Sequence, residues 1–252
     1  MIHFVGAGCG AVDLITVRGE RLLEQADVII YAGSLVNPQL LDYAKEDCAI
    51  YDSAGMTLEQ VIRVMRTAEK EEKMTVRLHT GDPSIYGAIR EQMDLLSQHA
   101  IDYDVTPGVS AFCGAAAALK AEYTLPQVSQ TVIITRMEGR TPVPEKEELS
   151  LLASHGATMA IFLSTGLLDS LKKRLLSGGY AKDTPAAIVY KATWPDEKTF
   201  VGTVDTLPQL AKDNNITKTA LILVGKFLAN EYGRSKLYDP AFTHGFRGGT
   251  SE

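Results

Sequence analysis

The segment IHFVGAGCGA, residues 2–11, decides the fold that we expect for this chain of 252 residues. Ile2–Val5 has the pattern of a short strand and runs directly into a cluster of glycines. Apolar positions at helical spacing, including Leu14, Val17 and Leu22, come next. A strand that passes through glycine into a helix is typical of the start of a βαβ unit, so we predict an α/β protein.

The same alternation continues along the chain. We predict further strands at 28–31, 74–79, 103–106, 131–135, 159–163, 186–190, 198–204 and 219–227, and helices at 85–96, 111–119 and 167–176. Parallel strands need a crossover connection, so the alternation indicates parallel sheets. The strand at 198–204 is expected to pair with the one before it across the turn-prone residues 194–197.

We expect two α/β lobes, residues 1–122 and 123–252, with the join between Leu119 and Gln130. The prolines and glycine of Gly139–Pro144 predict a loop in the second lobe. The glycine-containing tail, Asp239–Glu252, is expected to be mobile or to lie across a partner.

Composition excludes several classes of protein. The 25 Lys and Arg against 31 Asp and Glu give a net charge of -6, which argues against a general nucleic-acid binder. No apolar run is long enough to span a bilayer, and the N-terminus lacks the pattern of a signal peptide. Three widely spaced cysteines fit neither a disulfide framework nor a metal site, and the five histidines form no metal-binding motif. We therefore expect a cytoplasmic protein without a metal site of its own or a membrane anchor.

The first glycine cluster has two interpretations. As G-x-G-x-x-G/A, Gly6–Ala11 would bind a nicotinamide dinucleotide, but that needs an acidic residue at the end of the next strand. Tyr31–Ser34 offers no carboxylate there. The alternative is that the glycines allow a sharp turn beside a ligand or another loop.

Two further turns follow strands, at Gly81-Asp82-Pro83 and at Thr106–Ala111. Asp82 would either cap a helix that opens near Ser84 or hold the amino group of a bound amino acid. Ligands of open α/β sheets bind at the carboxyl ends of strands, so these turns predict a pocket at that edge.

Basic residues beside the turns suit a small polyanion better than a nucleic acid. They are Arg77, Arg90, Arg136, Arg140 and Lys191. The sequence has neither a G-x-S-x-G elbow nor a phosphate-binding P-loop, and His79 is expected to be a hydrogen-bonded structural residue. A reaction whose reactivity lies in a cofactor would explain why no nucleophile stands out.

The turns at residues 6–16, 81–83 and 106–111 resemble those of the tetrapyrrole methylases. The resemblance runs in the same order over nearly the whole chain, and residues 31–38, 79–88 and 124–131 resemble the branch that methylates precorrin-4 at C11, which includes the cobalt-bearing form. It implies two α/β lobes around a ligand cleft, S-adenosylmethionine as cofactor, S-adenosylhomocysteine as product, a tetrapyrrole substrate and a homodimer. Any cobalt would arrive with the substrate.

The resemblance also implies site residues. Cys9 stands where many relatives have proline in the first glycine loop. The implied cofactor contacts are Cys9, Thr80, Gly81, Asp82, Ile85, Ser110, Ala111, Leu163, Ser164, Ala192 and Ala220. Arg90, Arg136 and Arg140 would hold substrate carboxylates. No catalytic base is assigned; Asp104 and Asp13 are acidic candidates that also suit structural roles.

Three alternatives stay open at this point. One is a methyltransferase of the same superfamily that acts on another precorrin, on diphthine or on ribosomal RNA, although the acidic balance speaks against RNA. The second is a nicotinamide-dependent oxidoreductase, and the third is a ligand-binding module without catalysis.

Overall fold

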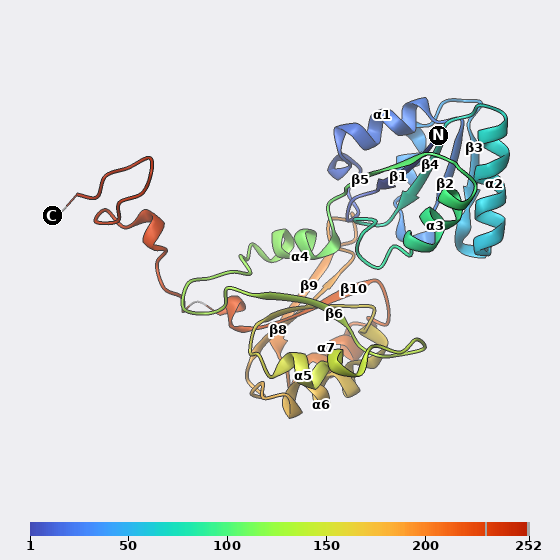
Figure 1. Cartoon of the computed structure of the whole chain (residues 1–252). Coiled ribbons are helices and arrows are strands. Elements are labelled where there is room, and N and C mark those ends of the chain that lie inside the picture. The colour runs from blue at the N-terminus through green and yellow to red at the C-terminus, as the bar shows by residue number, and fades with distance from the viewer. Residues whose placement is uncertain (230, 251–252) are drawn as a thin grey trace. The chain divides into compact units, whose positions relative to one another are not determined.

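A computed structural model describes residues 1–229 and 231–250 of the chain and contains two compact units (Figure 1). Unit 1 consists of Met1–Ala115 and Lys191–Glu197, and unit 2 of Ala116–Tyr190 and Lys198–Glu252. A short segment from the second half of the chain thus belongs to the first unit. The predicted division into lobes after residue 122 stays a prediction.

Unit 1 is built on a five-stranded parallel sheet, which confirms the predicted βαβ organisation. Its strands are β1 (Ile2–Gly6), β2 (Val28–Tyr31), β3 (Ala49–Asp52), β4 (Thr75–His79) and β5 (Tyr103–Thr106), in the order β3-β2-β4-β1-β5. Its helices are α1 (Val17–Gln25), α2 (Leu58–Lys70) and α3 (Arg90–Gln98), and α4 (Ala111–Leu119) begins in the same unit. The three glycine-containing turns all follow strands of this sheet.

Successive residues of β1 and β4 face opposite sides of the sheet, and each side has its own apolar core. Val5 and Leu78 pack with Leu23 of α1 on one side. Phe4 packs with Met65 of α2 and Leu96 of α3 on the other. Because both faces of the sheet are covered, its carboxyl edge is the open edge at which loops gather.

Unit 2 contains a mixed sheet. Its strands are β6 (Val132–Arg136), β7 (Thr158–Phe162), β8 (Pro185–Tyr190), β9 (Lys198–Thr203) and β10 (Ala220–Val224), in the order β6-β7-β10-β8-β9. Only β6 and β7 run parallel; the other neighbours are antiparallel, including the predicted pair β8 and β9. The helices α5 (Leu149–Ala153), α6 (Leu168–Ser177) and α7 (Leu207–Asp213) contribute to its core. Residues 139–144 form a loop, as predicted.

The predicted helix 85–96 is wrong at its start. Helix α3 begins only at Arg90; residues 83–86 form a turn and residues 87–89 are irregular. Tyr86 and Ala88 have positive φ angles of 56° and 50°, which a right-handed helix does not allow. The apolar spacing of this segment was therefore misleading, because it serves a folded loop rather than a helix.

The described part of the predicted tail, residues 239–250, is organised around Arg247. Its guanidinium donates to the carbonyls of Leu237 and Asp239, and its backbone pairs with that of His244. Residues 251 and 252 lie outside the described part. Within the described residues, every helix is too short or too polar to cross a bilayer.

Candidate active site

The three glycine turns of unit 1 meet at the carboxyl edge of the parallel sheet. Gly8 and Gly81 exchange backbone hydrogen bonds, 2.9 Å from the Gly81 amide to the Gly8 carbonyl and 3.2 Å in return. A Cβ on Gly6 would lie 2.6 Å from Cα of Gly108, and one on Gly108 would lie 2.2 Å from the Gly81 carbonyl oxygen. Only glycine fits at Gly6 and Gly108, so the turns after β1, β4 and β5 form one close-packed backbone cluster.

Asp82 joins two of these turns. Its Oδ1 accepts from the amide and the hydroxyl of Ser84, and its Oδ2 accepts from the amide of Gly108 at 2.9 Å. Partial burial opposes ionisation, but the hydrogen bonds from Ser84 and Gly108 outweigh it and lower the pKa of Asp82. No helix opens at Ser84, so Asp82 caps a turn instead of the expected helix. Its predicted contact with a cofactor amino group stays a prediction.

Predicted contacts from the second and third turns lie next to each other. A Cβ on Gly81 would lie 3.5 Å from Cα of Ser110 and 3.6 Å from the amide nitrogen of Ala111, the first residue of α4. Ile85 follows Asp82 in a turn closed by its own amide. Ser110 is buried.

Two buried polar atoms beside this cluster have no partner among the described residues. They are Nε2 of His79, the last residue of β4, and Oγ1 of Thr80, the residue that follows it. Unpaired buried polar atoms are rare and favour a site that a ligand completes. The expectation that His79 is a hydrogen-bonded structural residue stays a prediction, and at Nε2 no partner is found among the described residues. Burial and the nearby Arg77 lower the pKa of His79 to about 3, so the ring is neutral at physiological pH.

The segment Lys191–Glu197 packs on the first glycine turn. Thr193 Oγ1 accepts from the Ala11 amide at 3.0 Å and donates to Sγ of Cys9 at 3.4 Å. A Cβ on Gly10 would lie 2.2 Å from the Trp194 ring and 2.8 Å from the Ala192 carbonyl oxygen. Ala192 and Cys9, both predicted contacts, are thus brought to the same turn.

Cys9 is buried, and burial raises its pKa, so the side chain is a thiol rather than a reactive thiolate. A Cβ on Gly114 of α4 would lie 2.7 Å from its Sγ. Cys9 therefore acts as a small packing residue between the first turn and α4.

The remaining predicted cofactor contacts lie together in unit 2, where β7 ends and β10 begins. Leu163 is 67% exposed and has a φ of 52°. Ser164 is buried; its hydroxyl donates to the Phe162 carbonyl and accepts from the Met137 amide. The carbonyl of Ala220 accepts from Oγ1 of Thr165 at 3.0 Å. Leu163 is the one of these three whose side chain is most open.

The three predicted substrate arginines differ in their surroundings. Arg90 is exposed at the start of α3 and pairs with Asp94 one turn later. Arg136 donates to the carbonyls of Met137, Thr141 and Pro142, so its guanidinium holds the loop that follows β6. Arg140 lies exposed in that loop. Of the two loop arginines, the structure gives the supporting role to Arg136.

The two acidic candidates for a base stay a prediction, and their surroundings differ. Asp104 is the second residue of β5, and its carboxylate pairs with Nδ1 of His3 at 2.9 Å. Asp13 is exposed in a short 3-10 turn, Val12–Leu14. Both placements suit the structural interpretation that the sequence left open.

Sequence reasoning missed two groups of residues around the site. Trp194 was expected in a turn and Thr193 was given no role, although both residues contact the first glycine loop. Arg77 was grouped with the basic residues beside the turns that would suit a polyanion, yet it is buried, at 6% exposed. Its place between Val76 and Leu78 in a buried strand was the signal that could have shown this.

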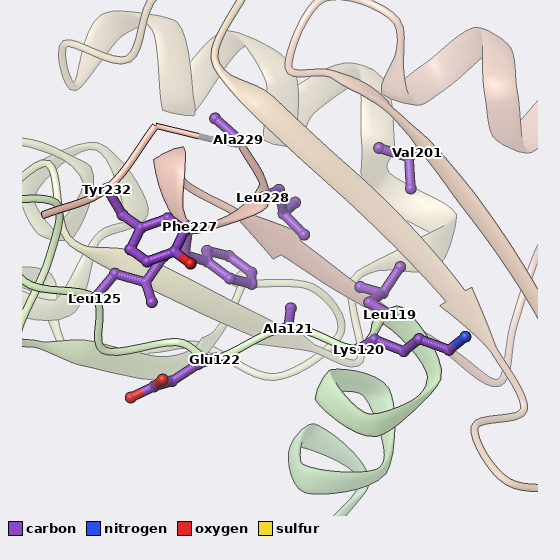
Figure 2. A pocket seen from close by; sticks show the side chains of 10 residues that line it. All are labelled: Leu119, Lys120, Ala121, Glu122, Leu125, Val201, Phe227, Leu228, Ala229 and Tyr232. Carbon is purple, nitrogen blue, oxygen red and sulfur yellow. The ribbon is translucent and has the colours of Figure 1, made fainter. Parts of the chain in front are cut away.

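A separate cavity of about 410 Å³ lies in unit 2 (Figure 2). Apolar side chains, among them Leu119, Leu125 and Phe227, form much of its wall, and Lys120, Glu122 and Tyr232 contribute polar atoms. It contains none of the predicted site residues.

Comparisons with known proteins agree with the fold. Residues 1–208 match the family described as Tetrapyrrole (Corrin/Porphyrin) Methylases. A cobalt-precorrin-4 C(11)-methyltransferase of Methanocaldococcus jannaschii is 56% identical over 247 residues, which cover 98% of this chain and 95% of the relative. A precorrin-4 C(11)-methyltransferase of Mycobacterium tuberculosis is 44% identical and covers 95% of this chain and 96% of its own length. The X-ray structure of a cobalt precorrin-4 methyltransferase matches with a TM-score of 0.88 at 49% identity, over 90% of this chain and 95% of that one.

Proposed function

Since the chain belongs to the family of tetrapyrrole methylases, we propose that it transfers a methyl group from S-adenosylmethionine to C11 of precorrin-4 in cobalamin biosynthesis. The observation that carries the proposal is the 56% identity, over nearly both full lengths, to a cobalt-precorrin-4 C(11)-methyltransferase. Identity falls to 44% for a relative named without cobalt. We therefore propose the cobalt-bearing ring as the substrate. Nothing in the family membership supports the nicotinamide alternative.

The residues of unit 1 fit the proposed cofactor. When bound, S-adenosylmethionine supplies a methyl group already activated by a sulfonium, so the protein has to bind and align it. The close-packed turns at Gly6, Gly81 and Gly108 let a ligand approach the backbone. Thr80 Oγ1 lacks a partner there and can hydrogen-bond the amino-acid end of the cofactor.

The charge pattern near the turns also suits a cationic cofactor. Asp82 is held as a carboxylate, and its Oδ2, which accepts one bond where Oδ1 accepts two, has acceptor capacity left. His79 stays neutral, so it does not repel a sulfonium or an ammonium group. We therefore keep Asp82 as the residue proposed to hold the cofactor's amino group.

We propose that the substrate's carboxylates contact Arg140 and Arg90, whose guanidinium groups are exposed. Arg136 supports Arg140 by fixing the two residues that follow it in the loop, Thr141 and Pro142. Bidentate bonds from arginine would orient a polycarboxylate ring without a catalytic base.

We also propose that the protein works in the cytoplasm as a homodimer. Several large apolar side chains of unit 2 are exposed, among them Val201 and Tyr232 beside the cavity of Figure 2 and Tyr238 and Phe246 in the tail. Exposed apolar side chains that lie close together, as Leu237, Tyr238, Phe242 and Phe246 do along the tail, favour a protein interface. Light scattering after size-exclusion chromatography checks the mass of the assembly, and a monomer at working concentration contradicts the proposal.

The reaction is tested by incubating the protein with S-adenosylmethionine and, separately, with precorrin-4, cobalt-precorrin-4 and uroporphyrinogen III. Mass spectrometry is expected to show the gain of one CH₂ unit on cobalt-precorrin-4, with fragmentation that places it at C11, and an equal amount of S-adenosylhomocysteine. Methylation of uroporphyrinogen III alone would overturn the proposed substrate. Calorimetry with NAD and S-adenosylhomocysteine separates the cofactors, since only the second is expected to bind.

A further inference from the structure

A chain of buried polar contacts connects the centre of the unit 1 sheet to the loop that follows β4. Arg77 of β4 donates from Nη1 to the Ile30 carbonyl of β2 and from Nε to Oε1 of Gln92 in α3, both at 3.1 Å. Nε2 of Gln92 in turn donates to the carbonyl of Ala88 at 3.0 Å. Arg77 and Gln92 are 6% and 5% exposed. The side chain of Gln92 is thus used at both ends.

The loop at the far end of this chain is the one that carries the proposed cofactor contacts Thr80–Ile85. Its backbone is tightly folded, because a Cβ on Gly87 would lie 2.2 Å from the Pro83 carbonyl oxygen. Tyr86 and Ala88 hold positive φ angles, which cost free energy in residues other than glycine. Such a conformation persists only where surrounding contacts impose it.

Two side chains contribute to holding the loop after β4 in this backbone conformation. Asp82 fixes the beginning of the loop through Ser84, and Gln92 fixes its end through Ala88. Gln92 is anchored in turn by its hydrogen bond from Arg77, whose guanidinium is bonded to the Ile30 carbonyl of the sheet. A buried guanidinium needs acceptors, and the Gln92 amide oxygen is one of the two that it finds.

We propose that Gln92 is a positioning residue for cofactor binding: anchored on Arg77, its amide group holds the Ala88 carbonyl and thereby keeps the loop Thr80–Ile89 in the conformation that binds S-adenosylmethionine. The inference rests on the proposed function of that loop. The role requires a side chain that accepts at one end and donates at the other, which an amide supplies and a carboxylate does not.

The variant Gln92→Glu tests this role directly. It keeps an acceptor for Arg77 and adds a favourable charge beside the guanidinium, but it replaces the donor to Ala88 by an oxygen that repels the carbonyl. The matched control is Leu96→Ala, one turn further along α3 on the same core. That change weakens the packing of the helix and leaves both hydrogen bonds of the Gln92 side chain in place.

Isothermal titration with S-adenosylhomocysteine and steady-state kinetics are the readouts, with thermal unfolding as a check on folding. For Gln92→Glu we expect the Kd and the KM for the cofactor to rise about tenfold, with kcat at saturating cofactor within about twofold of the starting protein. For Leu96→Ala we expect a lower Tm and an unchanged Kd. The conservative variant is Gln92→Asn, which keeps an amide group on a side chain one methylene shorter. We expect its affinity for S-adenosylhomocysteine to lie between that of the unaltered protein and that of Gln92→Glu.

The outcomes are distinguishable. If the unaltered protein binds no S-adenosylhomocysteine, the proposed function fails, and the inference fails with it. If the unaltered protein binds but Gln92→Glu binds equally well, only the positioning role is overturned. A Kd that rises as much in Leu96→Ala as in Gln92→Glu would assign the effect to helix stability and would also overturn it.

Discussion

The backbone amide of Gly108 donates to Oδ2 of Asp82 at 2.9 Å, and this bond ties together two turns that are 26 residues apart in the chain. The other carboxylate oxygen holds Ser84. One side chain thus sets both the local turn after β4 and its distance from the turn after β5. Loss of Asp82 should therefore do more than remove a cap.

We expect Asp82→Ala to weaken S-adenosylhomocysteine binding by about tenfold or more, because an amide is left without its charged acceptor and the two turns separate. Calorimetry measures the Kd, and urea denaturation measures the loss of stability. The control is Asp52→Ala. Asp52 also accepts from the amide two residues ahead, at Ala54, and its further bond is with the Tyr31 side chain, not with the backbone of a glycine turn.

Both variants should lose a similar cap contribution, about 0.5–2 kcal/mol. Only Asp82→Ala should change the Kd. Equal affinities in the two variants would leave Asp82 as an ordinary cap.

A methyl group at Gly108 should disrupt the backbone cluster. Gly108→Ala would place Cβ 2.2 Å from the Gly81 carbonyl oxygen, a distance that forces the turns apart. We expect weaker cofactor binding and a loss of about 1–3 kcal/mol in unfolding free energy, measured by calorimetry and urea denaturation. Gly55→Ala is the matched control, because nothing lies within 4 Å of its Cβ position. A Gly108→Ala protein as stable and as competent in binding as Gly55→Ala would contradict the close packing described above.

Asp82 and Gly108 also show which features of the site could be predicted from the sequence. The glycine turns were predictable, since each follows a short strand and carries residues with a local conformational reason to be there. Their pairwise contacts were not. The Gly8–Gly81 bridge and the Asp82–Gly108 bond depend on strand order, which puts β1 between β4 and β5 and which no local pattern encodes.

The errors have the same origin. Residues 85–89 follow a helical spacing, but the contact from Gln92 to Ala88 and the strained φ angles override it. Arg77 looks like a surface cation because its acceptors, Ile30 and Gln92, are 47 and 15 residues away. The fit of Thr193 and Trp194 to the first turn spans more than 180 residues. Local sequence patterns therefore predicted most helices and strands. Where the helix before Gln92 starts and which residues contact each other depend on long-range contacts, which those patterns do not show.

Variants of Arg136 and Arg140 should distinguish a residue that binds substrate from one that stabilises the loop. Arg140→Glu is expected to weaken substrate binding, because it replaces an exposed cation by an anion facing carboxylates, while Tm changes little. Arg136→Glu should weaken substrate binding and also lower Tm, since three backbone carbonyls lose their donor.

Fluorescence quenching by the substrate and thermal unfolding measure the two effects, and Kd for S-adenosylhomocysteine should stay constant in both variants. Substrate affinity unchanged in Arg140→Glu would remove Arg140 from the substrate site. An unchanged Tm in Arg136→Glu would show that the loop does not need its guanidinium.

His79 should make the protein sensitive to acid in a specific range of pH. Its pKa in the folded chain is about 3, below the ordinary value of 6.5, because burial and Arg77 oppose protonation. As the pH falls below 6.5 the unfolded chain binds a proton that the folded chain does not, so stability decreases and is fully present only above that pH. The expected loss of unfolding free energy from this residue between pH 7 and pH 5 is about 2 kcal/mol.

The variant His79→Phe tests this expectation. It keeps a ring against Phe4, with which His79 stacks at 6.1 Å between ring centroids, and it cannot titrate. Urea denaturation at pH 7 and pH 5 should therefore show a smaller loss for His79→Phe than for the unaltered protein, and equal losses would mean that His79 is protonated in the folded state.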